Sequence, residues 1–316
     1  MSLMEVRAPG LLTTVQDLGR EGFGPMGVSP SGAADSLALR IGNRLVGNPE
    51  GAAALEMTLV GGTFEFLEGA VVALAGSDFG TTLDNMAVDM WCSVEVRAGQ
   101  TLRVGTTRGG ARCYLCVRGG IEVKLFLGSA STHLLSGLGG FEGRALRKGD
   151  CLRIGTAGWA FRTFRKRTLA ARAKDILSPR KVLRVTAGPQ SGWFSEAAQK
   201  LFYKRSYHVA EESNRMGLRL EGTAIPLACG GEMISEGVSL GAVQITASGL
   251  PIILFVEQQT TGGYPKIANV ISVDLSSLGQ LRPRDEIRFE RVEMPAARAL
   301  LVEQESLLAS KELILA

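Results

Sequence analysis

The sequence contains few of the patterns that identify a nucleotide-, metal- or biotin-binding enzyme. It has no G-x-x-x-x-G-K-[ST] phosphate-binding loop, and "GREGFG" lacks the spacing of the G-x-G-x-x-G dinucleotide fingerprint. It also lacks H-E-x-x-H, G-x-S-x-G and a lysine in an A-M-K-M-type biotinylation context, and it has only two histidines. We therefore expect this chain by itself to bind no nucleotide, metal ion or biotin.

Cysteine is also sparse, with five residues at uneven spacing, which makes a poor disulfide framework. Cys113 and Cys116 form a C-x-x-C motif, but they lie in "ARCYLCVRGG", whose alternation is typical of a strand. Residues three apart on a strand point to opposite faces, so the two thiols would not converge on one metal ion. We predict that both are core cysteines and not a zinc or redox site.

Long apolar runs are missing as well. The run from Ile252 to Val256 is among the longest, and it is far shorter than the ~20 residues that a membrane-spanning helix needs. The start, "MSLMEVRAPG", has no basic region followed by an apolar stretch, so we expect no signal peptide. These features predict a soluble, cytoplasmic protein with no membrane partner.

Positive charge is concentrated in one segment. The formal net charge is +4, and residues 162–184 hold nine Lys and Arg against one Asp. Such a run could form a basic patch for nucleic acid or an acidic partner. No interleaved aromatic residues and no recognised nucleic-acid motif accompany it, so we favour a solvated linker and expect no nucleic-acid partner.

The remaining pattern predicts a mainly β protein with a few helices. Aromatic residues make up only 6% of the chain, whereas its 40 glycines indicate many tight turns. Short apolar runs separated by Gly-containing turns recur in both halves, as in a barrel or sandwich. The predicted regions are an N-terminal β-barrel-like domain (4–165), a basic linker (166–181), a C-terminal β-barrel (182–292) and a C-terminal helix (293–316).

Three helices interrupt the β pattern. Apolar residues recur at helical spacing between Ala34 and Leu45, and Gly47 supplies a stop. A second helix is predicted over 191–202, and Pro295 is placed to open the C-terminal helix.

The richest collection of polar groups lies in "PIILFVEQQTTGGYPKIANV", residues 251–270. A short apolar strand is followed within ten residues by a carboxylate, amides, hydroxyls and a lysine. Gly262 and Gly263 would let the backbone approach a ligand closely, and Pro265 would stiffen the turn. A carboxylate can take a proton, a lysine can stabilise developing negative charge, and amides can fix orientation. This loop is the leading candidate for a small-molecule site.

Three other stretches are dense in polar residues: "PGLLTTVQDLGREG", "SPSGAADS" and "ESNRMGLRLEG". Each also has a purely structural interpretation, because Asp and Asn in Gly-rich turns commonly bond to their own backbone and serines commonly cap helices. Both interpretations stay open for each stretch.

A family resemblance emerges from several blocks together. These blocks run in order from about residue 8 to residue 290: "PGLLTTVQDLGREG", "GVSPSGAADSLALRIGNRLVGNPEGAAALE", "GSASTHLLSGLGGFEGRALRKGD", "SNRMGLRLEG" and "QQTTGGYPKIANVISVDLSSLGQLRP". In them the chain resembles the family called allophanate hydrolase subunit 2, KipA or the 5-oxoprolinase C subunit. It is also similar to half of the carboxyltransferase domain of biotin-dependent urea carboxylase.

The resemblance implies two cyclophilin-like β-barrel domains and a sister subunit of the KipI or allophanate hydrolase subunit 1 type. It implies action on small amides, either lactam opening of 5-oxoproline to glutamate with a third subunit or carboxyl transfer to urea. ATP, or carboxybiotin in the second case, would be supplied by partner subunits and not bound by this chain. A third alternative is a KipA-like regulator that binds a kinase inhibitor without turnover.

On this basis we predict the C subunit of a bacterial ATP-dependent 5-oxoprolinase, an enzyme subunit that forms part of a small-amide site. Glu257 is the predicted acid/base or orienting group, and Lys266 is predicted to polarise an oxygen. The predicted substrate-binding residues are Gln16, Asp17, Arg20, Arg215, Gln244, Gln259, Thr260 and Tyr264.

The chain departs from the family pattern at one informative position. Family members commonly have Asp-Arg-Gln-Thr where this chain has Glu257-Gln258-Gln259-Thr260. The carboxylate is kept, but a fixed planar cation is replaced by a neutral amide. If the arginine binds an anionic group in the family, substrate choice differs here; if it only makes an ion pair in the barrel wall, catalysis is unaffected. A second change, Pro283-Arg284-Asp285 in place of Pro-Gly-Asp, is interpreted as neutral.

Overall fold

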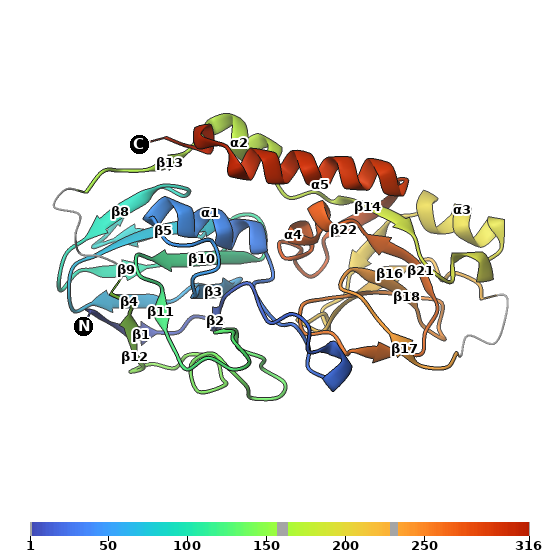
Figure 1. The fold of residues 1–316 in the computed structure, drawn as a ribbon, viewed down its shortest axis with the longest axis horizontal. Helices are drawn as coiled ribbons and strands as arrows, with labels where there is room; N and C mark the ends of the chain where they lie inside the picture. The colour runs from blue at the N-terminus through green and yellow to red at the C-terminus, as the bar shows by residue number, and fades with distance from the viewer. Residues whose placement is uncertain (1, 157–163, 228–232, 316) are drawn as a thin grey trace. The chain divides into compact units, whose positions relative to one another are not determined.

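The computed structural model describes residues 2–156, 164–227 and 233–315, and the chain divides into two compact units (Figure 1). The first unit comprises Met1–Arg20, Ser31–Leu177 and Leu308–Ala316, and the second comprises Glu21–Pro30 and Ser178–Leu307. The described part of the basic segment carries β13 and α2, and the division falls after Leu177. Most of the segment expected to be a linker therefore belongs to the first unit.

The first unit is built from two sheets and one small strand pair. The larger sheet has the order β11-β12-β1-β4-β9-β6-β7, the smaller has the order β2-β3-β10-β5-β8, and β13 pairs with β23. The strands are β1 (Ser2–Ala8), β2 (Leu12–Gln16), β3 (Ala54–Thr58), β4 (Thr63–Phe66), β5 (Ala70–Gly76), β6 (Thr82–Leu83), β7 (Met86–Ala87), β8 (Ser93–Val96), β9 (Thr101–Arg103), β10 (Arg112–Val117), β11 (Ile121–Glu122), β12 (Cys151–Ile154), β13 (Thr168–Leu169) and β23 (Ile314–Leu315).

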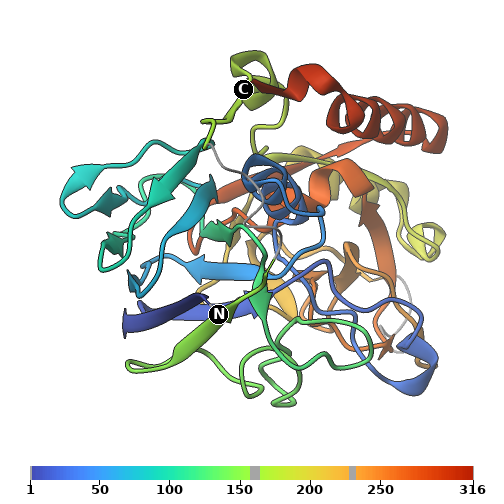
Figure 2. The same cartoon turned by 60° about the vertical axis from the view of Figure 1, so that its left-hand side comes forward.

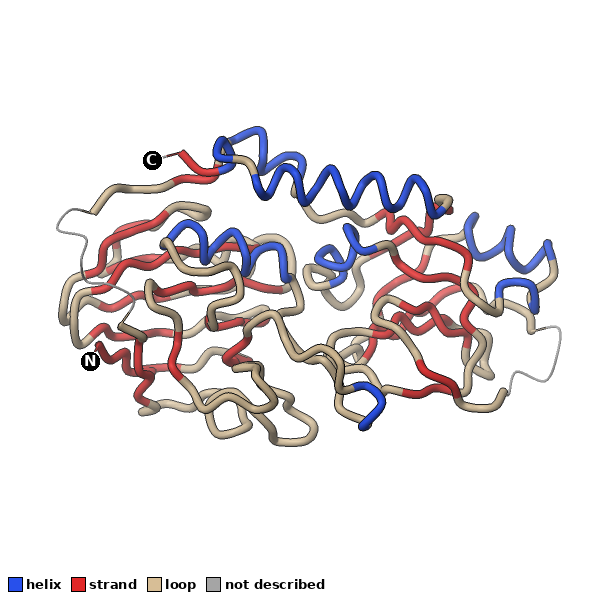
Figure 3. Tube along the Cα trace, viewed as in Figure 1, coloured by secondary structure: helices blue, strands red, loops and turns tan. Residues whose placement is uncertain are grey.

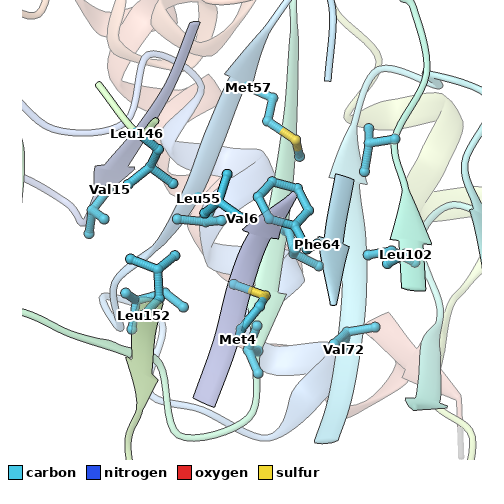
Figure 4. Packing of buried hydrophobic residues seen from close by; sticks show 14 of the residues in the cluster. Met4, Val6, Val15, Leu55, Met57, Phe64, Val72, Leu102, Leu146 and Leu152 are labelled. Atoms are coloured by element: carbon cyan, nitrogen blue, oxygen red, sulfur yellow. The ribbon is translucent and has the colours of Figure 1, made fainter. Parts of the chain in front are cut away.

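The core of the first unit is formed by apolar side chains from both sheets. Met4 of β1 and Phe64 of β4 come from the larger sheet, and they pack with Leu55 of β3 and Val72 of β5 from the smaller one (Figure 4). All four are fully buried. Because side chains alternate along each strand, one face of each sheet supplies this core.

Helix α1 (Ser36–Val46) packs against β5 and β10 of the smaller sheet (Figure 1 and Figure 2). Asp35 caps its first turn by accepting a 2.9 Å hydrogen bond from the Ala38 N–H, and Gly47 ends it in a left-handed conformation. This helix was predicted from its periodicity and is confirmed.

The C-x-x-C cysteines lie on opposite faces of β10, as predicted. Cys113 belongs to the core between the sheets. Cys116 lies on the α1 side, where a Cβ on Gly42 would come within 2.6 Å of its Sγ. Both thiols are free and buried, and desolvation raises the pKa of each far above that of an exposed cysteine. They therefore act as core residues.

The second unit contains several strands, drawn in red in Figure 3. They form a closed barrel with the order β14-β21-β18-β19-β16-β15-β22, which confirms the prediction of a mainly β, barrel-containing fold. Neighbouring strands of the barrel are antiparallel, except that β14 and β22 run parallel where the ring closes. The strands are β14 (Val182–Ala187), β15 (Tyr207–Val209), β16 (Gly217–Gly222), β18 (Ala242–Ile245), β19 (Pro251–Leu254), β21 (Lys266–Val270) and β22 (Glu286–Arg291), with β17 (Glu236–Gly237) and β20 (Thr261–Gly262) forming a separate pair.

Of the remaining helices in the described residues, α5 is the longest, with 16 residues. They are η1 (Gly24–Met26), α2 (Ala171–Ile176), η2 (Ser191–Trp193), α3 (Glu196–Lys204), η3 (Ser272–Asp274), α4 (Leu275–Leu278), α5 (Met294–Ala309) and η4 (Lys311–Leu313). The helix predicted over 191–202 is divided into η2 and α3, because Ser195 caps a new helix by accepting from the Ala198 N–H. Across the described residues, every helix is too short or too polar to span a membrane.

Candidate functional site

The lysine of the predicted loop reaches the site through a β-bulge. Strand pairing between β18 and β21 passes from Ala268 to Lys266 and skips Ile267, with Gln244 opposite Lys266. Without the bulge, Lys266 and Asn269 would point to opposite faces because they are three residues apart. The extra residue turns them to the same face. Both side chains therefore belong to one wall of the barrel.

That wall borders a cavity of about 730 Å³ within the second unit. Its size lies in the range of small-molecule sites. The lining residues come from η1, from the segment around β17, from the predicted loop and from β21: Gly24, Pro25, Gly27, Pro189, Glu236, Gly237, Val238, Ser239, Ala242, Thr260, Thr261, Lys266 and Asn269.

An ion pair is the main polar feature of the cavity wall. Lys266 Nζ lies 2.6 Å from Glu236 Oε1. The lysine side chain is almost completely buried, whereas the glutamate side chain is 45% exposed. Among the described lining residues these two are the only charged ones, so their charges cancel and the cavity has no net charge from its wall.

Gln190 holds both partners of this ion pair. Its Nε2 donates to Glu236 Oε1 at 2.9 Å, and its Oε1 accepts from the Lys266 N–H at 3.2 Å. Its own N–H donates to the Lys266 carbonyl, also at 3.2 Å. Since Gln190 is itself buried, the amide fixes the lysine backbone and the glutamate side chain relative to each other.

Gly188 completes this support by lying directly against the bulge. Its N–H donates to the Ile267 carbonyl at 2.9 Å, and a Cβ at this position would lie 2.3 Å from the Lys266 carbonyl oxygen. Only a glycine therefore fits this close approach of two backbones.

The carboxylate of Glu236 is held in its ionised form. The hydrogen bond from Lys266 is the main cause of a lowered pKa for Glu236, and the hydrogen bond from Gln190 acts in the same direction. A carboxylate in this state accepts hydrogen bonds from a ligand and donates none.

The predicted catalytic residue Glu257 occupies a different position. It forms a buried ion pair with Arg215 Nε through its Oε1, and its N–H donates to the Arg215 carbonyl at 2.8 Å. Neither residue is among those that line the cavity. The structure thus brings Glu257 and Arg215 together, while the carboxylate that meets Lys266 belongs to Glu236.

The other loop residues are divided between cavity, surface and interior. Thr260 lines the cavity, whereas Gln259 and Tyr264 are exposed and stand outside the lining set. Gln244 is buried opposite Lys266, close to Gly262. Gln258 donates to the Val238 carbonyl at 3.3 Å, and this hydrogen bond supports a residue of the cavity wall.

In the first unit, Gln16, Asp17 and Arg20 all hold the segment 129–132. Asp17 accepts from the Ser129 hydroxyl and the Ala130 N–H, each at 2.6 Å. Gln16 donates to the Thr132 carbonyl at 3.1 Å. The Arg20 guanidinium donates to the Ser131 carbonyl and lies 5.3 Å from the centre of the Phe126 ring. Their predicted role in substrate binding stays a prediction.

Sequence reasoning missed Glu236 and Gln190. Neither belongs to a dense polar stretch, and strands β18, β19 and β20 separate Glu236 from Lys266 along the chain. The pairing of β17 with β20 and the turn after β14 bring them to the bulge. Throughout the described residues, no group of three or more His, Cys, Asp or Glu side chains is placed to hold a metal ion.

Comparisons with known proteins place this chain in a family. The family described as carboxyltransferase domain, subdomain A and B, matches residues 26–291. The chain is 39% identical to the C subunit of 5-oxoprolinase from Escherichia coli strain K12, over 93% of each chain. It is 38% identical to the corresponding 5-oxoprolinase C subunit of Haemophilus influenzae, over 91% of this chain and 90% of the relative.

Solved structures agree with this assignment. The urea amidolyase of K. lactis superposes with a TM-score of 0.90 and 32% identity, over 99% of this chain but only 21% of the amidolyase. The protein TTHA0988 superposes with a TM-score of 0.80 and 36% identity, over 92% of this chain and 55% of TTHA0988. The same fold thus occurs inside longer polypeptides.

Proposed function

The chain belongs to the carboxyltransferase domain family, subdomains A and B, and on that premise we propose that it is the C subunit of an ATP-dependent 5-oxoprolinase. Two relatives that carry this name match it over at least nine tenths of both lengths. In this proposal the chain contributes a small-amide site, and 5-oxoproline is opened to glutamate by the assembled complex.

The observation that carries the proposal is the Lys266–Glu236 ion pair on the wall of the cavity. An amide presents a carbonyl oxygen and, when unsubstituted, an N–H on neighbouring atoms. A wall with an ionised carboxylate supplies the acceptor for that N–H, and the paired ammonium group of Lys266 keeps the carboxylate ionised. Thr260 and Asn269 on the same wall add hydroxyl and amide groups that can orient a small ligand.

The activated group is proposed to come from other subunits. Relatives of this chain are either named as a subunit or are much longer polypeptides. This supports the proposal that the chain acts together with other subunits. We propose that a sister subunit of the KipI type and a third 5-oxoprolinase subunit are these partners, that one of them binds ATP, and that the complex is cytoplasmic.

The role of Glu257 enters the proposal in a modified form. The positive charge of Arg215 balances the negative charge of Glu257 in a buried ion pair. The proposed contribution of Glu257 is therefore to fix the start of the predicted loop. Lys266 keeps a proposed role at the site as the ion-pair partner that holds Glu236 in the cavity wall.

A urea carboxylase-type carboxyltransferase is the second candidate, and the charge of the cavity favours it. The two charged residues in the described lining cancel each other. Urea is neutral and needs no further cation, whereas 5-oxoproline carries a carboxylate near neutral pH. The K. lactis urea amidolyase, which contains the same fold, is consistent with this alternative.

The test is a coupled assay of 5-oxoproline-dependent ATP hydrolysis with the purified chain and the subunits encoded beside it. Turnover that requires every component, with glutamate formed, would support the first proposal. Turnover of urea with a biotin carboxylase and a biotin carrier would support the second. A stable complex with no turnover of either amide would instead indicate a regulatory role of the KipA kind.

A further inference from the structure

We infer that Glu236, and not Lys266, is the residue that meets the ligand in this cavity, where its carboxylate accepts the N–H of an unsubstituted amide. Lys266 and Gln190 then act as positioning residues for that carboxylate. The inference rests on the proposed function, because it identifies which feature of a small amide the site recognises.

Accessibility is the first observation behind this inference. The Nζ atom of Lys266 is shielded from solvent, and its nearest acidic neighbour is Glu236 Oε1 at 2.6 Å. The Glu236 side chain is 45% exposed and lines the cavity. A ligand entering the cavity therefore meets the carboxylate first, and it could reach the ammonium group only by displacing that carboxylate.

The two oxygens of Glu236 are not equivalent. Oε1 forms the ion pair with Lys266 Nζ and accepts a hydrogen bond from Gln190 Nε2. No hydrogen bond to Oε2 occurs among the described residues. The ion pair and the hydrogen bond on one oxygen restrict the rotation of the carboxylate, so the lone pairs of the second oxygen keep a constant position for a ligand.

Ligand chemistry follows from this arrangement. An ionised carboxylate accepts hydrogen bonds only, so it attracts N–H groups and repels a bare carbonyl oxygen. A neutral wall made by a matched ion pair adds no attraction for a second carboxylate. The recognised class is thus an amide or lactam with a free N–H, with any carboxylate of the ligand directed away from Glu236.

The test uses two lactams that differ only at nitrogen, 2-pyrrolidinone and N-methyl-2-pyrrolidinone. Binding of each to the full chain is measured by ligand-observed NMR titration. We expect the wild type to bind the N–H compound roughly 10- to 100-fold more tightly, which is the range for a hydrogen bond to a charged group. The preference should be lost in Glu236→Ala and reduced in Glu236→Gln, which keeps the shape and removes the charge.

Gln190→Ala should weaken binding of 2-pyrrolidinone and leave N-methyl-2-pyrrolidinone unaffected, because it frees the carboxylate to rotate. The matched control is Gln199→Ala. Gln199 lies in the adjoining helix α3, and its side chain donates to the backbone carbonyls of Ser191 and Phe194, at 3.0 and 3.1 Å. The binding of both lactams should be unchanged in this control.

Equal binding of the two lactams by the wild type would overturn the inference, as would failure to bind either one. A preference that survives in Glu236→Ala would also overturn it. The proposed function is judged separately by turnover of 5-oxoproline in the assembled complex. Turnover that persists in Glu236→Ala would leave the function standing and remove Glu236 from the site.

Discussion

Lys266 Nζ lies 2.6 Å from Glu236 Oε1, and this contact joins the bulged strand β21 to the short strand β17. It pairs a shielded ammonium group with a partly exposed carboxylate, and Gln190 donates to the same oxygen. The cavity wall therefore presents a carboxylate whose charge and orientation are determined by Lys266 and Gln190.

Lys266→Met should raise the pKa of Glu236, because it removes the main cause of the lowered value. A carboxyl group whose pKa falls on folding adds stability above its unfolded-state pKa, about 4.3 for Glu, and loses it as the pH falls through the folded value. The stability that the lowered Glu236 pKa contributes, and that is lost at low pH, should therefore be smaller in the variant.

NMR titration of the Glu236 side chain measures this change in pKa, and the acidic limb of any pH–rate profile should move to higher pH. Lys200→Met, at a side chain that is 79% exposed, is the control; an unchanged Glu236 pKa in Lys266→Met would contradict the expectation.

Gly188→Ala should destabilise the second unit by about 1–3 kcal/mol, the usual range for overpacking. The added Cβ would lie 2.3 Å from the Lys266 carbonyl oxygen and 2.7 Å from the Ala268 nitrogen, so the bulge must move. Gly192→Ala is a close control in the next turn, since nothing lies within 4 Å of its Cβ position. Urea denaturation of both variants measures the difference, and equal midpoints would show that the bulge is not tightly packed.

The Arg215–Glu257 pair predicts a strong cost for removing one partner. Arg215→Met or Glu257→Leu leaves an uncompensated buried charge and should lower the free energy of unfolding by about 3–5 kcal/mol. The double variant Arg215→Met/Glu257→Leu should recover most of this loss, because both charges are gone. Chemical denaturation of the three variants provides the cycle.

Activity of the same double variant separates two roles for Glu257. If Glu257 only fixes the loop, the refolded double variant should retain turnover in the assembled complex. A stable double variant without turnover would instead support the catalytic role predicted from the sequence.

Asp17→Asn should destabilise the first unit by about 1.5–3 kcal/mol, the value of hydrogen bonds to a charged group. Asp17 Oδ1 accepts from the Gly19 N–H and Oδ2 accepts from the Ala130 N–H. An asparagine must place its NH2 group against one of these donors. Hydrogen exchange of the Ala130 amide should accelerate, whereas Asp89→Asn, at a side chain that is 83% exposed, should leave it unchanged. Unaltered protection of Ala130 in Asp17→Asn would exclude this structural role.

Much of the fold can be predicted from local patterns in the sequence. The spacing between Ala34 and Leu45 predicts α1, and Gly47 ends the helix as expected because it supplies the left-handed conformation. The alternation in "ARCYLCVRGG" separates Cys113 from Cys116, since strand periodicity alone decides the face. Domain boundaries are harder to predict from the sequence. The segment expected to be a linker, 166–181, contributes β13 and α2 to the first unit.

Some residues of the candidate site can likewise be predicted from the sequence, and others cannot. Lys266 and Thr260 could be selected in advance because they lie in one short loop that is rich in polar groups. Glu236 and Gln190 could not be selected, because their partners are distant in sequence. Glu257 was selected from the same loop, but Arg215, in the bend before β16, forms an ion pair with that carboxylate.

The sequence by itself determined the family, the β-rich fold, the first helix and the loop that carries Lys266, because these depend on composition, periodicity and continuous motifs. The tertiary structure alone decided which carboxylate faces the cavity. A one-residue bulge at Ile267 sets the side of the barrel on which Lys266 lies, and strand pairing brings Glu236 and Gln190 to it. Such pairing depends on register between distant strands, and no local pattern of residues specifies it.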